Sequence, residues 1–270
     1  MSRNTQQGSA VSEETGKTPD ILERGAPVDG QPQTAETRLY MQLNVFTLSG
    51  AGFAGQPGQP RQTRTMANDI AASLEDSGLD AAVYLDVNDP VGIGVLFLAE
   101  DPDTFVSDVR NLLTGRPFDV LDRRGSMTML GRTYSMGFEP DLMESLIHRP
   151  RNTVLNPDWP WAIWYPLRRN GAFARLEHKE QRQILMEHAH IGRAYGRADF
   201  AHDIRLACYG LDAADNDFVI GLIGKDLYPL SRVVQDMRKT QQTALYIDSL
   251  GPFFVGKKTW SSDPLRSSDP

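Results

Sequence analysis

Cysteine is nearly absent from this 270-residue sequence, in which Cys208 is the only one. A single thiol excludes an internal disulfide framework and any Cys-x-x-Cys pair for a metal or for redox exchange. Long apolar runs are missing as well, because no stretch reaches the roughly 18 uninterrupted apolar residues of a membrane-spanning helix. The 40% of hydrophobic residues can still fill an ordinary core, so we expect a soluble globular protein.

Positive charge is also in short supply. The chain has 28 Lys and Arg against 35 Asp and Glu, which gives a formal net charge of -7. This balance provides no broad basic field for a nucleic-acid backbone or an anionic membrane surface, and we expect neither as a partner. The first residues are polar and lack the apolar segment of a secretory signal, so we expect a cytoplasmic location.

Three segments have too few large apolar residues to form regular structure. Residues 1–37 are rich in Gln, Thr, Ser, Gly, Pro and Glu and are predicted to be a disordered tail whose deletion leaves stability nearly unchanged. Residues 49–63 carry four glycines and two prolines, which predicts a loop. Residues 259–270 are predicted to be a flexible tail.

Two halves, residues 38–150 and 151–258, show the same order of apolar patterns. Period-two runs predict strands, and three-to-four-residue spacing predicts helices. The first half reads as a strand at 39–47, a helix at 66–78, strands at 81–87 and 91–98, and a helix at 101–113. The second reads as a strand at 159–167, a helix at 177–195, strands at 204–209 and 218–223, a long helix at 227–247 and a short strand at 253–255.

The repeated βαββα order predicts the fold class. We expect an α+β protein in which duplicated ferredoxin-like units form a dimeric α+β barrel, the second half of which carries the functional residues.

One histidine lies on the apolar stripe of the helix at 177–195. Ile184 and Leu185 precede His188 by four and three residues, and Ile191 follows it by three, so all share a face. His190 lies on a mostly polar face. From position alone, His188 is either a core histidine satisfied by a hydrogen bond or a metal ligand in an apolar pocket.

Several stretches of the second half resemble the chlorite dismutase family. Met186-Glu187-His188, followed by Gly192-Arg193 and Tyr195, is similar to the proximal helix of that family. Other matching pieces occur in the same order as in the family: Tyr165-Pro166, Gly210-Leu211-Asp212, Asp217-Phe218, Asp236-Met237-Arg238 and residues 251–256 with the sequence Gly-Pro-Phe-Phe-Val-Gly. The resemblance covers about residues 159–258 and implies the same α+β fold.

The resemblance implies a haem cofactor with His188 as the axial iron ligand. No Cys-x-x-Cys-His stretch is present, so haem b or coprohaem would be bound non-covalently. The likeness is greatest to the coproheme decarboxylase branch of haem synthesis, which oxidises propionates to vinyl groups with hydrogen peroxide. Tyr165 then matches the tyrosine that forms the radical. Arg169 and Arg238 match basic residues that bind propionates, and Arg168 is an alternative to Arg169.

The opposite side of the iron is less clearly matched. Chlorite-degrading members place an arginine there, and decarboxylases often have glutamine or histidine. In this sequence the position falls near Asp203, with Arg205 on the same strand face and His202 on the other. We expect Arg205 to be the distal catalytic group, with Asp203 and His202 as alternatives. The glutamate that binds the axial histidine in chlorite-degrading members aligns with Ile223, which disfavours chlorite chemistry.

Three functions remain open from the sequence. The first is a peroxide-dependent coproheme decarboxylase. The second is a chlorite dismutase or general haem peroxidase, and the third is a non-catalytic haem-binding protein. The family usually assembles as rings of five, so the resemblance also implies a homo-oligomer, with the pentamer as the form expected from the family.

Overall fold

The computed structural model describes residues 18–48 and 59–264 of the chain. The first 17 residues of the predicted N-terminal tail, most of the predicted loop at 49–63 and the last six residues of the C-terminal tail lie outside these described residues.

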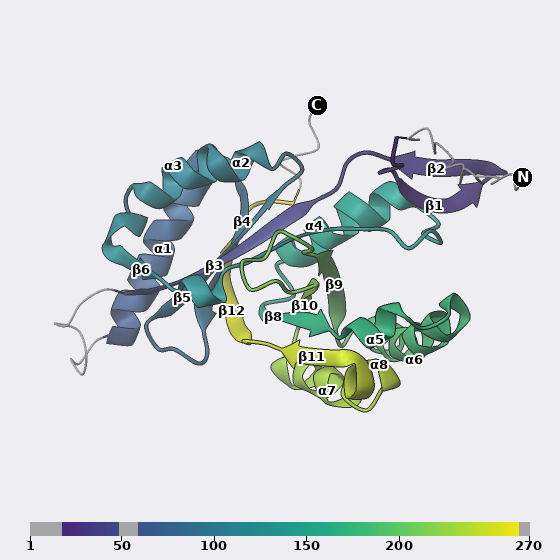
Figure 1. Ribbon diagram of the computed structural model, residues 1–270. Helices are drawn as coiled ribbons and strands as arrows, with labels where there is room; N and C mark the ends of the chain where they lie inside the picture. The colour runs from purple at the N-terminus through teal and green to yellow at the C-terminus, as the bar shows by residue number, and fades with distance from the viewer. Residues whose placement is uncertain (1–17, 49–58, 265–270) are drawn as a thin grey trace, which may run out of the picture.

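The first half contains a hairpin, a three-stranded core and its covering helices (Figure 1). Its strands are β1 (Glu23–Val28), β2 (Gln31–Ala35), β3 (Tyr40–Leu48), β4 (Asp80–Asp86), β5 (Gly92–Ala99), β6 (Leu121–Arg123) and β7 (Met129–Arg132). Its helices are α1 (Gln59–Ser77), α2 (Asp103–Val106) and α3 (Asp108–Thr114), with short 3-10 turns at Phe118–Val120 and Gly125–Met127.

A π-helical turn at Glu144–His148 and helix α4 (Arg149–Leu155) lead into the second half. The strands there are β8 (Trp161–Arg169), β9 (His202–Ala207), β10 (Phe218–Gly224), β11 (Ile247–Leu250) and β12 (Phe254–Ser261). The helices are α5 (Gly171–Ala174), α6 (His178–Arg197), α7 (Leu227–Met237) and α8 (Gln241–Tyr246).

The main sheet closes on itself. Within the described residues its strands follow the order β10-β9-β7-β3-β5-β4-β12-β8, and β8 pairs again with β10. The pairings are antiparallel, and β9 meets β7 through Arg132 and Ala207 alone. Strands from both halves thus form one α+β barrel with helices on its outer faces, as the duplicated ferredoxin-like pattern predicts.

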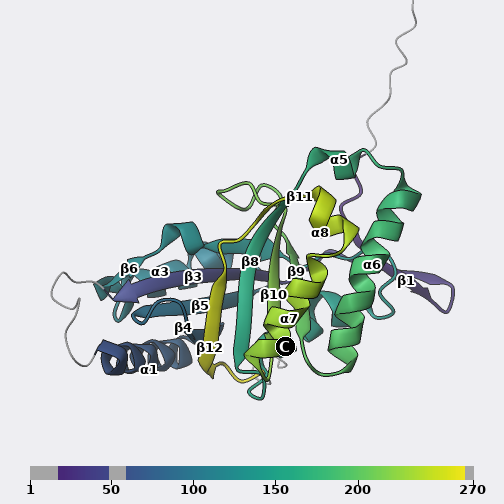
Figure 2. The same cartoon turned by 90° about the horizontal axis from the view of Figure 1, so that it is seen from below.

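Three apolar layers hold this barrel together. The interior is filled by side chains from both halves, among them Met41, Tyr84, Trp164 and Phe254, all buried. A second layer lies between α1, α3 and the outer face of β4 and β5. A third lies between α6, α7 and the outer face of β8 and β10. Figure 2 shows the two sets of helices on opposite sides of the strands.

The structure corrects the predicted N-terminal tail. Residues 23–35 form the β1–β2 hairpin rather than a disordered segment, and Asp29 and Gly30 at its turn both have positive φ angles. Asp-Gly is a strong hairpin signal because both residues tolerate this conformation. Gln33 fixes the hairpin to the body of the protein: its Nε2 donates to the Glu139 and Pro140 carbonyls, and its Oε1 accepts from the Leu142 amide.

Two further boundaries differ from those predicted. Strand β12 continues to Ser261, so the predicted flexible tail at 259–270 begins too early. The predicted helix at 227–247 is two helices, α7 and α8, because Thr240 leaves the helical conformation and begins α8. The apolar periodicity continues across this break and therefore does not indicate it.

The barrel interior leaves no space beside Trp164. A Cβ atom on Gly221 would lie 2.5 Å from the Trp164 ring, and Gly221 pairs with Trp164 across β10 and β8. We therefore expect Gly221→Ala to lower the free energy of unfolding by about 1–3 kcal/mol, the usual cost of forcing extra volume into a packed core. Chemical denaturation would measure this loss. Gly125→Ala is the matched control, since nothing lies within 4 Å of its added Cβ. Equal stabilities of the two variants would contradict the packing described.

Candidate functional site

The outer face of β8, β10 and β9 brings two of the predicted site residues into one row. Tyr165 pairs with Ile220, and Ile220 pairs with Arg205. Residues directly opposite in a sheet point to the same side, so Tyr165 and Arg205 share the face covered by α6 and α7, about 10 Å apart across two strand spacings. The same strands turn Trp164, Ile204 and Val219 into the barrel.

Two pieces of the family-like pattern meet beside Tyr165. The Gly251 amide donates a hydrogen bond of 2.9 Å to the Pro166 carbonyl, and the Phe253 ring stacks on the Tyr165 ring with centroids 4.6 Å apart. Burial raises the pKa of Tyr165 above its ordinary value, an effect that the Asp203 carboxylate reinforces and Arg238 opposes. Tyr165 is therefore held as a neutral phenol in an aromatic environment.

A third piece of the pattern fixes Arg169. The Asp217 carboxylate accepts from the Arg169 amide at 2.6 Å. The Arg169 guanidinium lies between the Phe173 and Phe218 rings, 4.7 and 4.6 Å from their centroids. Its Nε is buried and has no hydrogen-bond partner among the described residues. A buried donor without a partner is costly, and this Nε is free to donate to an acceptor from outside the chain.

The other two predicted arginines differ in position. Arg168 donates to the carbonyls of Ala214 and Asp215 and holds the turn before β10, so it does not replace Arg169. Arg238 lies exposed at the C-terminal end of α7, and its charge acts on the pKa of Tyr165.

His188 lies on the face of α6 that turns toward the sheet. Ile184, one turn earlier, is buried, His188 itself is half-buried, and His190 is exposed. The Nδ1 atom of His188 lies 3.3 Å from the Thr240 hydroxyl, the one described hydrogen bond of this ring. Burial lowers the pKa of His188 to about 4, and the Arg205 guanidinium acts in the same direction. The imidazole is therefore neutral at ordinary pH, the form that binds a metal.

A hydrogen bond holds α6 against α7. The Tyr195 hydroxyl donates to the Asp236 carboxylate at 2.8 Å, and Arg232 binds the same carboxylate at 3.2 Å. This bond lowers the pKa of Asp236. Tyr195 and Asp236 both belong to the family-like stretches, and their role here is to fix the two helices that cover the sheet face.

The predicted distal residues divide between the two faces of β9. Asp203 and Arg205 lie on the helix side and form an ion pair of 3.2 Å. His202 points the other way, where its Nε2 lies 2.9 Å from Asp199 and its ring stacks on Trp159 at 3.6 Å. His202 thus lies on the face of β9 opposite to the one that carries Asp203, Arg205 and the row with Tyr165.

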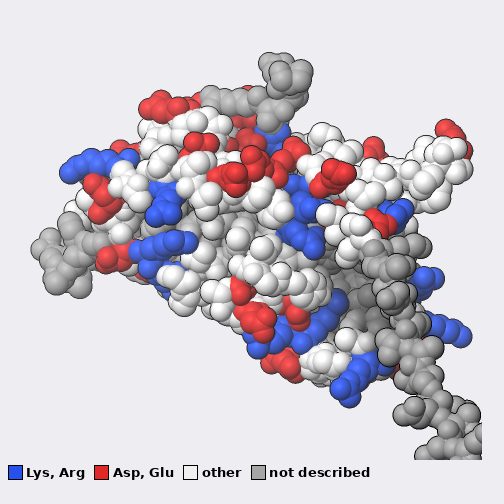
Figure 3. Space-filling view, turned by 45° about the horizontal axis from the view of Figure 1, so that its top comes forward, with Lys and Arg blue, Asp and Glu red and all other residues white. Residues whose placement is uncertain are grey.

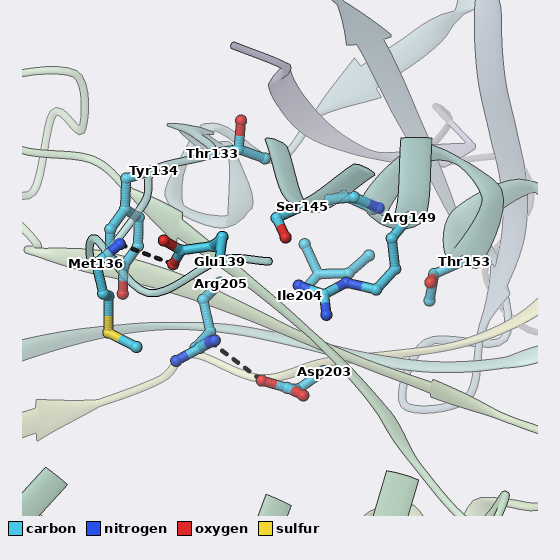
Figure 4. A pocket seen from close by; sticks show the side chains of 11 residues that line it. Thr133, Tyr134, Met136, Glu139, Ser145, Arg149, Thr153, Asp203, Ile204 and Arg205 are labelled. Carbon is cyan, nitrogen blue, oxygen red and sulfur yellow. Dashed lines mark hydrogen bonds and ion pairs between the residues drawn. The ribbon is translucent and has the colours of Figure 1, made fainter. Parts of the chain in front are cut away.

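A small hollow of about 40 Å³ opens beside this ion pair (Figure 4). Asp203 and Arg205 form one side, and Arg149 and Glu139 approach from the α4 end and the loop after β7. Tyr134 also lines it and packs on Phe218, with ring centroids 5.7 Å apart. Sequence patterns do not point to Tyr134, Glu139 or Arg149, because the segment that carries them has no periodic pattern and comes from the first half.

The side chain of Ile223, the residue aligned with the glutamate of chlorite-degrading members, does not face α6. Ile223 points into the barrel interior with Trp164 and Val219, away from α6. The residue of β10 that faces the helices at this level is Leu222. An apolar side chain therefore occupies the helix-facing position, and His188 hydrogen-bonds a hydroxyl.

Neither the surface charge nor a cluster of metal-ligating residues points to a second site among the described residues. Acidic and basic side chains are interspersed on the face shown in Figure 3. Among residues 18–48 and 59–264, no helix is both long and apolar enough to span a bilayer, and no group of three or more His, Cys, Asp or Glu could hold a metal ion.

The fold and site define an α+β barrel with one histidine on a helix facing a tyrosine and arginines on a sheet. A model of the chlorite dismutase family matches residues 74–259, more than half of the chain, so the protein belongs to that family. Comparison with curated proteins yields no match.

Solved structures share the fold at low sequence identity. A haem-binding protein from Thermus thermophilus is 22% identical, with a TM-score of 0.62 over 82% of this chain and 91% of that one. A mutant chlorite dismutase from Candidatus Nitrospira defluvii is 14% identical, with a TM-score of 0.63 over 84% and 93%. The enzyme from that organism in complex with imidazole is also 14% identical, with a TM-score of 0.62 over 84% and 93%.

The residues between α6 and the sheet suit a haem. A neutral imidazole faces the site, with no described hydrogen bond to its Nε2. The buried Nε of Arg169 lacks an acceptor among the described residues, which a propionate would supply. Ile220, Leu222 and Val255 give the apolar surroundings that a macrocycle needs.

The low pKa of His188 predicts how the haem-free protein responds to acid. An unfolded histidine titrates near pH 6.5, whereas His188 titrates at about 4 when folded. Between these values the unfolded state binds more protons, so stability is highest above pH 6.5 and falls as the pH is lowered toward 4. Denaturation at a series of pH values should show a loss of up to about 3 kcal/mol from this group.

The control is His188→Gln, which cannot titrate. The difference in unfolding free energy between the parent and this variant should shrink as the pH falls from 7 to 4. If that difference is independent of pH, His188 is not held neutral by burial.

Proposed function

We propose that this protein is a haem-dependent oxidoreductase that uses hydrogen peroxide to decarboxylate propionate groups of coprohaem. The observation that carries the proposal is the row of Tyr165 and Arg205 on the sheet face opposite His188. The charge of Arg169 acts on the pKa of His188, and the charge of Arg238 acts on the pKa of Tyr165. This arrangement provides one metal ligand, one oxidisable side chain and several anion-binding groups beside the apolar residues between α6 and the sheet.

When bound, the haem would supply the iron that passes the oxidising power of peroxide to the protein. His188 would hold the iron through Nε2, and Arg169 would bind a propionate through its guanidinium. Arg205, beside the hollow of Figure 4, would orient a small oxidant that enters there. Tyr165 would give up an electron and its phenolic proton, then take a hydrogen atom from the propionate.

The overall step balances without another reactant. One propionate, one hydrogen peroxide and one proton give one vinyl group, one carbon dioxide and two water molecules. The propionate loses two electrons, and the peroxide accepts them. Tyr165 is restored when it receives the hydrogen atom, so it acts as a relay and is not consumed.

A chlorite dismutase or general peroxidase is the second candidate, and Arg205 is the observation that favours it. Chlorite-degrading members of the family that this chain resembles have an arginine on this side of the iron. Arg205 lies on the same sheet face as Tyr165 and would match it. The hydrogen bond of His188 to Thr240 instead of a carboxylate argues against it, because a carboxylate makes the ligand more basic. The Thermus haem-binding protein keeps a third candidate open, a non-catalytic haem carrier.

Removal of His188 should abolish most haem binding. We expect His188→Ala to weaken binding of coprohaem and of haem b by on the order of 100-fold or more, since loss of a mere hydrogen-bond partner of a metal ligand costs about 10–100-fold. Titration followed by the Soret band would measure this. His190→Ala, two residues along the same helix and exposed, should bind as the parent does. Equal binding by parent and His188→Ala would refute the ligand assignment.

Removal of the Tyr165 hydroxyl should separate binding from reaction. Tyr165→Phe keeps the ring that stacks on Phe253 but cannot form a phenoxyl radical. We expect it to bind coprohaem with the parent's affinity yet release no carbon dioxide with peroxide, as mass analysis of the product porphyrins would show.

Tyr134→Phe is the matched comparison, because Tyr134 is a half-buried tyrosine that packs on Phe218 near Arg205. If Tyr134→Phe loses the reaction and Tyr165→Phe keeps it, the relay is Tyr134. Rapid oxygen release from chlorite by the parent, with no decarboxylation, would favour the second candidate.

A further inference from the structure

Thr240 occupies a buried point where three helices meet. It lies after α7, begins α8 and is 1% exposed. Figure 2 shows α8 at the end of α7 and beside α6. The Thr240 hydroxyl accepts from the Thr243 amide at 3.4 Å, as an N-cap residue does. The same oxygen lies 3.3 Å from Nδ1 of His188, so one hydroxyl serves both the helix end and the imidazole.

The hydrogen bonds of this hydroxyl determine which tautomer His188 adopts. Thr240 Oγ1 has one proton, and its nearest acceptor is the Met237 carbonyl at 2.8 Å. With its proton directed there, the oxygen meets His188 only through a lone pair, so Nδ1 must carry the hydrogen. The lone pair of the neutral ring is then on Nε2, the atom left for a metal.

A second contact holds the same two helices in register. The carboxylate of Glu187 accepts from the Gln241 amide at 3.0 Å. Adjacent residues of α6 therefore bind adjacent residues at the start of α8. This contact also directs the Glu187 carboxylate to the end of α8, while the neighbouring imidazole meets the hydroxyl.

We propose that Thr240 is the positioning residue of the His188 imidazole, fixing its Nδ1–H tautomer and leaving Nε2 as the metal-binding atom of a ligand of moderate basicity. This rests on the proposed role of His188 as the iron ligand. A hydroxyl oxygen attracts the Nδ1 proton less strongly than a carboxylate, because it has no net charge. The imidazole therefore transfers less electron density to the iron than a histidine paired with a carboxylate.

Three substitutions at this one position separate the hydrogen bond from the helix cap. Thr240→Ser keeps the hydroxyl. Thr240→Val keeps the shape but loses both the acceptor and the cap. Thr240→Asp keeps the cap and replaces the hydroxyl with a charged acceptor, so the effect on the imidazole should have the opposite sign to that in Thr240→Val.

The first measurement uses the haem-free protein. Nitrogen-15 NMR of the imidazole should show the Nδ1–H tautomer of His188 in the parent and in Thr240→Ser. In Thr240→Val we expect a mixture with a major share of the Nε2–H form. A parent with the Nε2–H tautomer, or a Thr240→Val variant with the parent's tautomer, would overturn the proposal.

The second measurement uses the protein loaded with haem b. The ferrous iron–histidine stretching frequency should fall in Thr240→Val, stay at the parent's value in Thr240→Ser and rise in Thr240→Asp. The reduction potential should move up, stay and move down in the same order. Shifts of the same sign in Thr240→Val and Thr240→Asp would attribute the effect to disruption of α8 and overturn the proposal.

The His188 variant and the Thr240 variants test two separate roles. If His188→Ala binds haem like the parent, the ligand assignment is wrong, while the tautomer measured without haem still tests the Thr240 contact. If His188→Ala loses haem and the Thr240 variants shift neither tautomer nor frequency, the ligand assignment stands and the positioning role is wrong.

Discussion

The register of β8 is the constraint on which the barrel and the site both depend. This strand pairs with β10 and β12 and so closes the sheet, and its side chains alternate between two buried faces. Trp164 fills the barrel, where Gly221 makes room for it, and Tyr165 faces the helices. A slip of one residue would exchange these two aromatic side chains. The close contact between Trp164 and Gly221 prevents that slip and thereby places Tyr165 opposite α6.

In both halves helices cover the outer face of the sheet, but the residues between helix and sheet differ in polarity. Under α1 the outer sheet face is apolar. Ile70, Leu74 and Phe97 pack there and are each at most 1% exposed. Under α6 the corresponding face carries Tyr165, Asp203 and Arg205, and the helix supplies a half-buried histidine. Asp203 and Arg205 pair with each other at 3.2 Å, and the buried Nε of Arg169 has no partner among the described residues, so the second half holds the polar groups that a ligand can contact.

Much of this fold could be predicted from periodicity, because each buried face leaves its own spacing in the sequence. The strands at β3, β4, β5, β8 and β10 and the helix α6 lie close to the ranges expected. The hairpin at residues 23–35 was missed although its Asp29-Gly30 turn signals it, since its strands are polar. Of the site, His188, Tyr165 and Arg205 could be named from the resemblance, whereas Tyr134 could not, because it reaches the site from the other half.

Thr240 shows why the partners of a site residue are harder to foresee than the residue itself. The apolar spacing of 227–247 fits one helix, and a continuous helix would satisfy its backbone bonds at position 240 and leave the threonine side chain on its surface. The observed break turns the hydroxyl toward α6, where it lies 3.3 Å from Nδ1 of the His188 imidazole. The gain from that contact depends on His188, 52 residues away, which no local pattern contains. Local sequence thus specifies where each helix can form, while contacts between helices decide where it ends.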